Sequence, residues 1–295
     1  ASALRRKGLA AKLLLPANLL IGFWQSARAI FRIRPEVVLG MGGYVAFPGG
    51  MMASLLARPL AVHEQNAVAG LANRVLARVA DRRFAAFPGA LRDAEWTGNP
   101  VRAEIARIAQ PETRYAARSG PLRLLIVGGS LGAQALNEAV PKALALIADG
   151  ERPKVVHQSG EKHLDSLKTN YRAAGVQGET LAFIENMAER YAAADLVICR
   201  AGAITVAELS AGGMASVLVP FPHAVDDHQS ANARFLADRG AAILLPQREL
   251  TPQKLAATIR SLDRARLLDM ARKARALGKP EAARVVAERC MELAA

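Results

Sequence analysis

Short apolar segments alternate with longer amphipathic segments over most of the chain. In the second half, the apolar segments lie near residues 122–127, 154–158, 180–184, 195–199, 216–220 and 242–245. Short apolar runs bounded by glycine and polar residues are typical of strands buried on both faces, and the segments between them repeat their apolar positions with helical spacing. This alternation predicts a doubly wound parallel sheet covered by helices.

The first half follows the same alternation less regularly. It predicts strands at 37–39, 59–66 and 83–87 and helices over 51–56 and 71–79. Glycines at 40, 42 and 43, and a proline and two glycines at 48–50, separate the first strand from its helix. We therefore expect a second α/β layer in this half of the chain.

The segment 97–102 is the predicted boundary between two domains. Gly98 and Pro100 interrupt regular structure there, and a new series of strands and helices begins after Gly120. A chain of 295 residues is also long for a single core. We expect two Rossmann-like domains: one over 1–101, completed by a C-terminal helix within 280–295, and one over 102–279.

Three glycines follow the predicted strand at 122–127 directly: Gly128, Gly129 and Gly132. A strand, a glycine turn and a helix start place backbone N–H groups and the positive end of a helix dipole where a phosphate can bind, and Ser130 adds a hydroxyl. Val127 stands where a dinucleotide fingerprint has its first glycine, and the next strand ends in Gln158 rather than an acidic residue. The turn therefore predicts a phosphate or nucleotide site other than NAD; the alternative is a turn needed only for close helix packing.

A second turn of this kind follows the strand at 195–199. Gly202 precedes a predicted helix whose start could hold an anion, with the Thr205 hydroxyl beside it. Glu208 lies three residues further along the same helix face, where its carboxylate could accept two ribose hydroxyls. The alternative for Glu208 is a solvated glutamate on a helix surface.

Two further clusters of polar residues lie at strand ends, where ligands of open α/β sheets bind. The strand at 59–66 ends in His63, Glu64, Gln65 and Asn66. The segment 220–232 contains His223, Asp226, Asp227, His228, Gln229 and Asn232. Because the second cluster lacks the H-x-x-x-H spacing and a closed set of ligands, it favours recognition of sugar hydroxyls over a metal site.

The composition restricts the class of partner. A net charge of +13 favours an anionic partner, but aromatic residues make up only 5% and no aromatic-plus-basic motif appears, which argues against nucleic acid. Two distant cysteines indicate a reducing compartment.

Near the start, an apolar patch in a basic collar is too short to span a bilayer and is interrupted by Pro16. It predicts docking on an anionic membrane, packing on a sheet, or both; its residues are Leu13, Leu14, Leu15, Leu19, Leu20, Phe23 and Trp24.

Six segments, taken together and in order, resemble one family of enzymes over the whole chain. They are 38–44 (VLGMGGY), 63–66 (HEQN), 98–102 (GNPVR), 127–130 (VGGS), 199–203 (CRAGA) with Thr205 and Glu208, and 227–229 (DHQ). The resemblance is to the MurG family, the UDP-N-acetylglucosamine–N-acetylmuramyl-(pentapeptide) pyrophosphoryl-undecaprenol N-acetylglucosamine transferases of bacterial cell-wall synthesis.

The resemblance implies a GT-B fold, with two Rossmann-like domains facing across a cleft, and inverting transfer of N-acetylglucosamine from UDP-N-acetylglucosamine to a lipid-linked acceptor without a required cofactor or metal. It implies a peripheral protein on the cytoplasmic face of the inner membrane, with cell-wall or division proteins as further partners. The implied donor-site residues are Asn66, Arg102, Ser130, Ile184, Ala203, Ile204, Thr205, Val206, Ala207, Glu208, His228 and Gln229. Ser130 and Thr205 would bind diphosphate, Ile184 uracil, Glu208 ribose, and Gln229 with His228 the sugar hydroxyls. Tyr44, His63 and Glu64 would lie on the acceptor side.

The chain departs from the family pattern at its start. The family opens with a G-G-T-G-G-H segment that carries the histidine proposed as general base, and this segment does not occur here. We therefore expect a shortened chain with an incomplete first domain, an open sheet edge and impaired turnover, in which His63 is the candidate substitute base. The alternatives are a UDP-sugar-binding, membrane-associated module without turnover, another GT-B enzyme such as a UDP-sugar epimerase, and a basic scaffold protein.

Overall fold

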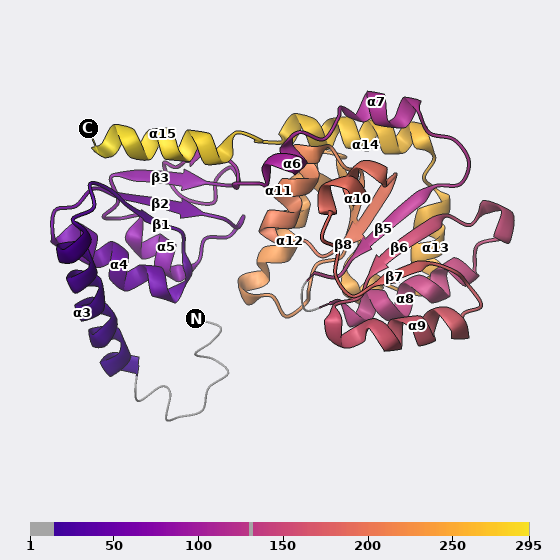
Figure 1. The fold of residues 1–295 in the computed structure, drawn as a ribbon, viewed down its shortest axis with the longest axis horizontal. Helices are drawn as coiled ribbons and strands as arrows, with labels where there is room; N and C mark the ends of the chain where they lie inside the picture. Colours follow the sequence, from indigo (N-terminus) through magenta and orange to yellow (C-terminus); the bar gives the residue numbers. More distant parts are fainter. Residues whose placement is uncertain (1–14, 130–131, 295) are drawn as a thin grey trace. The chain divides into compact units, whose positions relative to one another are not determined.

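The computed structural model describes residues 15–129 and 132–294, and these form two compact units (Figure 1). The first unit comprises Ala1–Pro100 together with Glu281–Ala295, and the second comprises Val101–Pro280. Each unit is an α/β structure with its own parallel sheet. The first unit is therefore discontinuous in sequence, because the chain returns to it through its last helix.

The sheet of the first unit has its strands in the order β1-β2-β3-β4, all parallel. The strands are β1 (Val38–Gly40), β2 (Leu60–Glu64), β3 (Arg82–Ala85) and β4 (Glu95–Trp96). Alternate residues of β2 face opposite sides of the sheet. Leu60 and Val62 pack with α4 (Gly43–Leu55) and α5 (Leu71–Leu76), whereas Ala61 packs against α15 (Ala282–Ala294), the yellow helix beside β3 in Figure 1. The C-terminal helix thus closes one face of the first sheet.

The sheet of the second unit has the order β10-β9-β8-β5-β6-β7, also wholly parallel. Its strands are β5 (Arg123–Val127), β6 (Lys154–Gln158), β7 (Glu179–Leu181), β8 (Leu196–Cys199), β9 (Ser216–Leu218) and β10 (Ala242–Leu244). The strand order reverses between β5 and β8, which is the point where open α/β sheets bind ligands. Both predicted glycine turns follow these two strands.

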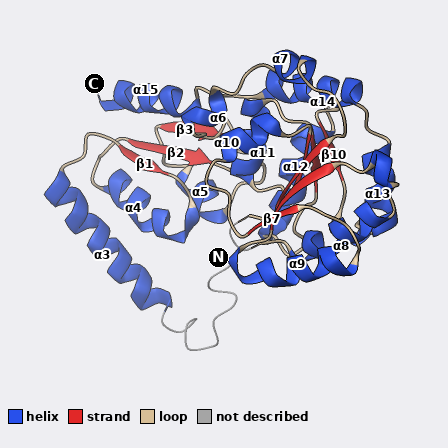
Figure 2. Ribbon diagram, turned by 45° about the vertical axis from the view of Figure 1, so that its right-hand side comes forward, coloured by secondary structure: helices blue, strands red, loops and turns tan. Residues whose placement is uncertain are grey.

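Helices surround this second sheet (Figure 2). They are α6 (Ala103–Ala106), α7 (Pro111–Ala116), α8 (Gln134–Ala145), α9 (Leu164–Ala173), α10 (Met187–Ala193), α11 (Ala203–Gly212), α12 (His228–Ala237), α13 (Pro252–Arg260) and α14 (Arg264–Leu277). Single 3₁₀ turns lie at Asp149–Glu151, Glu161–His163, Val225–Asp227 and Gln247–Glu249. α8 packs against α9 and α13, and α11 packs against α12 and α14, so α11 is enclosed by other elements.

The structure corrects two predictions about the first unit. The helix expected over 51–56 already begins at Gly43 and contains Pro48, because α3 (Leu15–Ile33) supports it at that point. A Cβ atom on Gly22 of α3 would lie 3.2 Å from the ring of Pro48, so the two helices approach closely there. Pro16 does not interrupt α3 but lies in its first turn, where a missing N–H breaks no helical bond.

Several strands and one helix are shorter than predicted. β7 and β9 each end at the third residue of their pairing, and α5 ends at Leu76 rather than at 79. As a result Ile184, expected at the end of β7, lies in the loop that leads to α10. Apolar content alone does not define the residue at which a strand ends, because the end of backbone pairing depends on the length of the adjacent strand.

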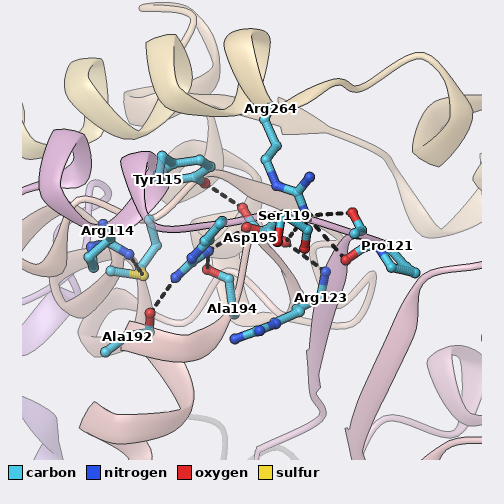
Figure 3. A network of polar contacts seen from close by, with 12 residues as sticks. Arg114, Tyr115, Ser119, Pro121, Arg123, Ala192, Ala194, Asp195 and Arg264 are labelled. Atoms are coloured by element: carbon cyan, nitrogen blue, oxygen red, sulfur yellow. Dashed lines mark hydrogen bonds and ion pairs between the residues drawn. The ribbon is translucent and has the colours of Figure 1, made fainter.

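Asp195 holds the amino-terminal edge of the second sheet together (Figure 3). Its buried carboxylate pairs with Arg118, accepts the backbone N–H of Arg123 at 2.8 Å, and lies 3.6 Å from Arg264. The Tyr115 hydroxyl donates to the Asp195 carbonyl oxygen. The network joins α7, β5, β8 and α14 at the edge of the sheet opposite the glycine turns. It therefore stabilises the two strands, β5 and β8, that precede those turns.

Candidate active site

A pocket of about 640 Å³ lies in the second unit where the two glycine turns converge. The turn after β5 lines it with Gly129 and Gly132, and the turn after β8 lines it with Arg200 and Thr205. Gln229 at the start of α12 lines it as well. Two of the predicted donor-site residues, Thr205 and Gln229, therefore share one pocket with the glycine turn. Ser130 lies outside the described residues.

The first turn requires glycine for both close packing and backbone conformation. Gly132 has φ +73°, and a Cβ atom on it would lie 2.1 Å from the carbonyl oxygen of Ser159. A Cβ atom on Gly128 would lie 2.7 Å from the backbone nitrogen of Ala133. Gly129 has φ +82° with open space around it, so only its conformation favours glycine. The same turn therefore both packs closely against its neighbours and lines the pocket.

Arg200 is the cation of this pocket, and sequence reasoning did not select it. Its guanidinium donates to the Val219 carbonyl at 3.1 Å and to Gln247 Oε1 at 2.7 Å, and it lies over the ring of Phe221. These contacts are with uncharged groups, and burial lowers the pKa of Arg200. This positive charge beside two glycine turns suits a diphosphate, although the pocket lining also includes the carboxylate of Glu138. Arg200 could have been selected from the sequence by its position between the end of β8 and the second glycine turn.

The amino terminus of α11 points its backbone at the same region. Gly202 is the N-cap residue, so the N–H groups of Ile204 and Thr205 have no partner within the helix. Val206 differs, because its side chain is fully buried and its N–H donates to the Gly202 carbonyl at 2.9 Å. Ala203 and Ala207 are half-buried. The anion-binding capacity of this helix therefore resides in its first turn.

Glu208 is buried within the second unit and is not a solvated helix glutamate. It is 8% exposed, and its Oε1 accepts from Arg102 Nη2 at 3.0 Å. Oε2 accepts from the hydroxyl of Tyr191 at 3.4 Å. Burial raises the pKa of Glu208, and the Arg102 guanidinium opposes this effect. The structure thus brings together two predicted donor-site residues and adds Tyr191, for which the sequence pattern carried no signal.

The remaining predicted donor residues of the second unit lie at the borders of this region. Gln229 Oε1 accepts the backbone N–H of Phe221 at 2.9 Å, which orients the side chain across the loop before α12. His228 is half-buried in the first turn of the same helix. Ile184 is buried in the loop after β7 and does not line the pocket. Their assignments to sugar and uracil stay predictions.

The polar cluster at the end of β2 is buried and satisfied by the protein itself. His63 is 0% exposed; its Nε2–H donates to the Gly98 carbonyl at 2.9 Å, which leaves Nδ1 to accept from Gln65 Nε2 at 3.3 Å. Burial lowers the pKa of His63. Glu64 accepts from Asn73 Nδ2 at 2.7 Å and from the Asn66 backbone at 2.9 Å. This geometry favours a structural role for both side chains.

The other predicted residues of the first unit are exposed. Tyr44 lies in the first turn of α4 with more than half of its surface accessible. On α3, Leu20 is 70% and Trp24 is 62% exposed, while Phe23 packs edge-on against Phe47. Leu19 is half-buried. Leu13 and Leu14 lie outside the described residues, as does the side chain of Leu15.

The described residues contain neither a membrane-spanning helix nor a cluster of potential metal ligands. Within residues 15–129 and 132–294, no helix is both long enough and apolar enough to cross a bilayer. In the same part of the chain, no three histidine, cysteine, aspartate or glutamate side chains gather into a potential metal site. The expectation that no metal is required stays a prediction.

Two α/β units, each with its own parallel sheet, are the architecture of the GT-B fold, and the family matches identify the chain as a glycosyltransferase of this class. Residues 123–289 match the family described as "Glycosyltransferase family 28 C-terminal domain", and residues 1–85 match "Glycosyltransferase family 28 N-terminal domain". The chain belongs to this family and, within it, to the MurG group of transferases. The resemblance and fold class predicted from the sequence are thereby confirmed.

Two curated relatives are similar over nearly the whole chain. A protein of Aromatoleum aromaticum is 67% identical and one of Cupriavidus metallidurans 64% identical, each over 99% of this chain and 82% of its own length. Both are named "UDP-N-acetylglucosamine--N-acetylmuramyl-(pentapeptide) pyrophosphoryl-undecaprenol N-acetylglucosamine transferase".

Solved structures agree with this assignment. The crystal structure of MurG from Acinetobacter baumannii has a TM-score of 0.86 at 41% identity, covering 94% of this chain and 79% of that one. The UDP-GlcNAc 2-epimerase of Neisseria meningitidis, solved with UDP-GlcNAc, has a TM-score of 0.64 at 12% identity, covering 94% of this chain and 82% of its own. At that identity the epimerase shares the fold alone.

Proposed function

We propose that this protein transfers N-acetylglucosamine from UDP-N-acetylglucosamine to undecaprenyl-pyrophosphoryl-N-acetylmuramyl-pentapeptide, converting lipid I to lipid II in peptidoglycan synthesis. Relatives that carry this activity in their names, at 64% and 67% identity, support the proposal. The structural observation that carries it is the single pocket shared by the glycine turn, Arg200 and the first turn of α11. Each of these features suits a diphosphate.

The proposed reaction inverts the configuration at C1 of the transferred sugar. The acceptor hydroxyl attacks C1 of N-acetylglucosamine from the face opposite UDP, the C1–O bond to UDP breaks, and UDP departs with the electron pair. Arg200 and the N–H groups of Ile204 and Thr205 would stabilise the charge that develops on the diphosphate. Glu208 would accept the ribose hydroxyls, Gln229 the sugar hydroxyls, and the loop at Ile184 would contact uracil.

The proton of the acceptor hydroxyl must pass to a base. His63 does not fit this role in the described structure, because its ring is fully buried and both ring nitrogens contact protein atoms. We therefore assign the role of base to no described residue. His63 has a structural role in this proposal, because its hydrogen bond links β2 to the carbonyl of Gly98.

We further propose a peripheral position on the cytoplasmic face of the inner membrane. The exposed side chains of Leu20 and Trp24 on α3, together with basic residues such as Arg28 and Arg32, provide an apolar surface within a positive collar. Such a surface suits a membrane of anionic lipid. It would bring the acceptor, whose lipid chain is in the bilayer, to the first unit.

Transfer of labelled N-acetylglucosamine to a short-chain lipid I analogue tests the enzymatic proposal, with UDP binding followed by calorimetry. Formation of the product supports it. UDP binding without product favours a non-catalytic donor-binding module, and turnover of UDP-N-acetylglucosamine without acceptor favours an epimerase. Absence of both binding and product overturns the proposal.

A pair of arginine variants sharpens this experiment. Arg200→Met should weaken UDP binding by about 10- to 100-fold, because one charge-assisted interaction contributes about 1.5–3 kcal/mol. Arg248→Met is the matched control, since Arg248 is exposed and lies next to Gln247 without lining the pocket. Equal loss in both variants would reflect net charge rather than the pocket.

A further inference from the structure

The side chain of Gln158, at the end of β6, bonds to two different loops at the carboxyl edge of the second sheet. Its Nε2 donates to the Gly129 carbonyl at 3.0 Å, and its Oε1 accepts the Gly129 N–H at 3.1 Å. The same Nε2 donates to the Ala182 carbonyl at 3.0 Å. Gly129 belongs to the glycine turn that lines the pocket, and Ala182 begins the loop that carries Ile184.

We propose that Gln158 is a positioning residue that holds the diphosphate-binding turn and the base-binding loop in one fixed arrangement. This inference rests on the proposed function, because it takes the turn at Gly129 to bind diphosphate and the loop at Ile184 to bind uracil. Gln158 contacts no ligand in this scheme. It acts through the two loops and sets the distance between the two halves of the nucleotide site.

The chemistry of the site requires a primary amide. The two carbonyl oxygens need N–H donors, whereas the Gly129 N–H needs an acceptor, and only an amide side chain of this length supplies both from one end. Gln158 is 3% exposed, so water cannot replace these bonds. The backbone of Gln158 is fixed by its pairing with Val127 on one side and Leu181 on the other.

The glycine turn depends on this support because its own constraints are few. Gly129 has φ +82° and no heavy atom within 4 Å of a Cβ position, so side-chain packing does not hold it. Its carbonyl accepts the Gly132 N–H at 2.9 Å in addition to Gln158. Removal of the Gln158 side chain takes away two of the described bonds to Gly129, and binding must then supply part of the cost of ordering this residue.

Three probes separate the two halves of the site: UDP, uridine and inorganic pyrophosphate, each titrated by calorimetry or ligand-observed NMR. In Gln158→Met, which retains side-chain length and removes all three bonds, UDP affinity should fall by about 10- to 100-fold. Uridine and pyrophosphate should each weaken by several-fold. Thr205→Val is the comparison, because it should weaken pyrophosphate and leave uridine unchanged.

Asn170→Ala serves as the structural control. It removes one partly buried amide-to-carbonyl bond, from Nδ2 to the Asn137 carbonyl at 3.0 Å, in the same unit but with neither partner in the two loops. It should leave the affinities for all three probes within about twofold of the wild type, since no loop of the site is altered. Thermal unfolding of each variant establishes the temperature at which the binding is compared.

The outcomes distinguish the inference from the function on which it rests. Wild-type protein that fails to bind UDP overturns both. Wild-type binding with unchanged UDP affinity in Gln158→Met, or with a loss confined to pyrophosphate, overturns the inference alone. If Gln158→Met does not fold, Gln158→Glu replaces it with uridine as the deciding probe. Uridine carries no charge, so the new carboxylate weakens it only by releasing the loop at Ala182; unchanged uridine affinity contradicts the inference.

Discussion

Arg102 holds Glu208 through a single carboxylate oxygen: Oε1 accepts from Nη2 at 3.0 Å and from Nε at 3.2 Å. The other oxygen, Oε2, faces the hydroxyl of Tyr191. Glu208 is thereby kept in one orientation by a cation on one side and a buried phenol on the other. In the proposed function, a carboxylate fixed in this way accepts the ribose hydroxyls without first being ordered.

Removal of the cation should make UDP binding sensitive to acid. Burial raises the pKa of Glu208 and Arg102 lowers it, so Arg102→Met should raise the pKa further. A protonated Glu208 is a poorer acceptor for ribose hydroxyls, and UDP affinity should therefore decline on acidification from a higher pH than in the wild type. Calorimetry between pH 5 and pH 8 measures this. Arg107→Met, an exposed change at the end of α6, should leave the wild-type profile unaltered.

Tyr191→Phe tests the other support of Glu208. The variant removes a hydroxyl that is completely enclosed and donates at 3.4 Å, and it leaves the ring packing intact. We expect a loss of about 1 kcal/mol, seen as an increase of several-fold in the dissociation constant for UDP. Pyrophosphate binding should not change, because it does not use the ribose site. Weakened pyrophosphate binding would show that Tyr191 acts on the whole unit instead.

Asp195→Asn should destabilise the second unit strongly. The Arg118 side chain is 6% exposed, and it would lose the negative partner that compensates its buried charge. Breaking one member of a buried pair costs about 3–5 kcal/mol, which urea unfolding measures directly. Asp149→Asn is the matched control, since Asp149 pairs with Arg152 at the surface and should contribute less than about 1 kcal/mol.

His157 predicts a loss of stability in acid. Burial lowers its pKa to about 3, while Nε2 lies 3.1 Å from Asn137 Oδ1 and Nδ1 lies 3.1 Å from the Tyr171 hydroxyl. Between about pH 6.5 and pH 3 the unfolded chain binds the extra proton, so stability falls as the pH decreases, by about 2 kcal/mol at pH 5.

Urea unfolding at pH 7 and pH 5 tests this assignment. His157→Gln should be less stable at pH 7 but should lose less stability on acidification than the wild type. The surface substitution His223→Gln should retain the wild-type difference between the two pH values. An unaltered difference in His157→Gln would assign the acid sensitivity to other groups.

The exposed face of α3 should determine binding to vesicles. Leu20→Ser combined with Trp24→Ser removes two large apolar side chains, each able to contribute about 1.5–3 kcal/mol on burial in lipid. Co-sedimentation with phosphatidylglycerol vesicles should fall at least tenfold, and high salt should weaken the remainder. Met291→Ser alters an equally exposed apolar residue on α15 and should have no effect. Equal losses would place the contact elsewhere.

The sequence allowed prediction of those features that have a periodic or local signal. Parallel strands buried on both faces are continuous apolar runs, and β5, β6 and β8 were found where such runs occur. The turn at Gly128–Gly132 and the start of α11 were predictable because each is one short segment. α4 was not, since Pro48 and its neighbouring glycines indicate a break that packing against α3 overrides.

The contacts between distant segments had no signal in the sequence. Arg102 and Glu208 meet through the fold and not through spacing, as do Gln158 and Ala182. The burial of His63 could not be predicted for a related reason, because its partner Gly98 lies 35 residues further along the chain and no sequence pattern links the two. A residue type and a strand end suggest chemistry, but the partners of that residue decide whether it is available.

The return of α15 to the first sheet has a consequence for synthesis on the ribosome. Ala61 and Phe84 are covered by Val286 and Cys290, which are translated only after the whole second unit. At about 5–20 residues per second, this delay is on the order of ten to tens of seconds. During that time the second unit can fold, while one face of the first sheet waits uncovered. We expect nascent chains to expose this face to chaperones until the last helix emerges.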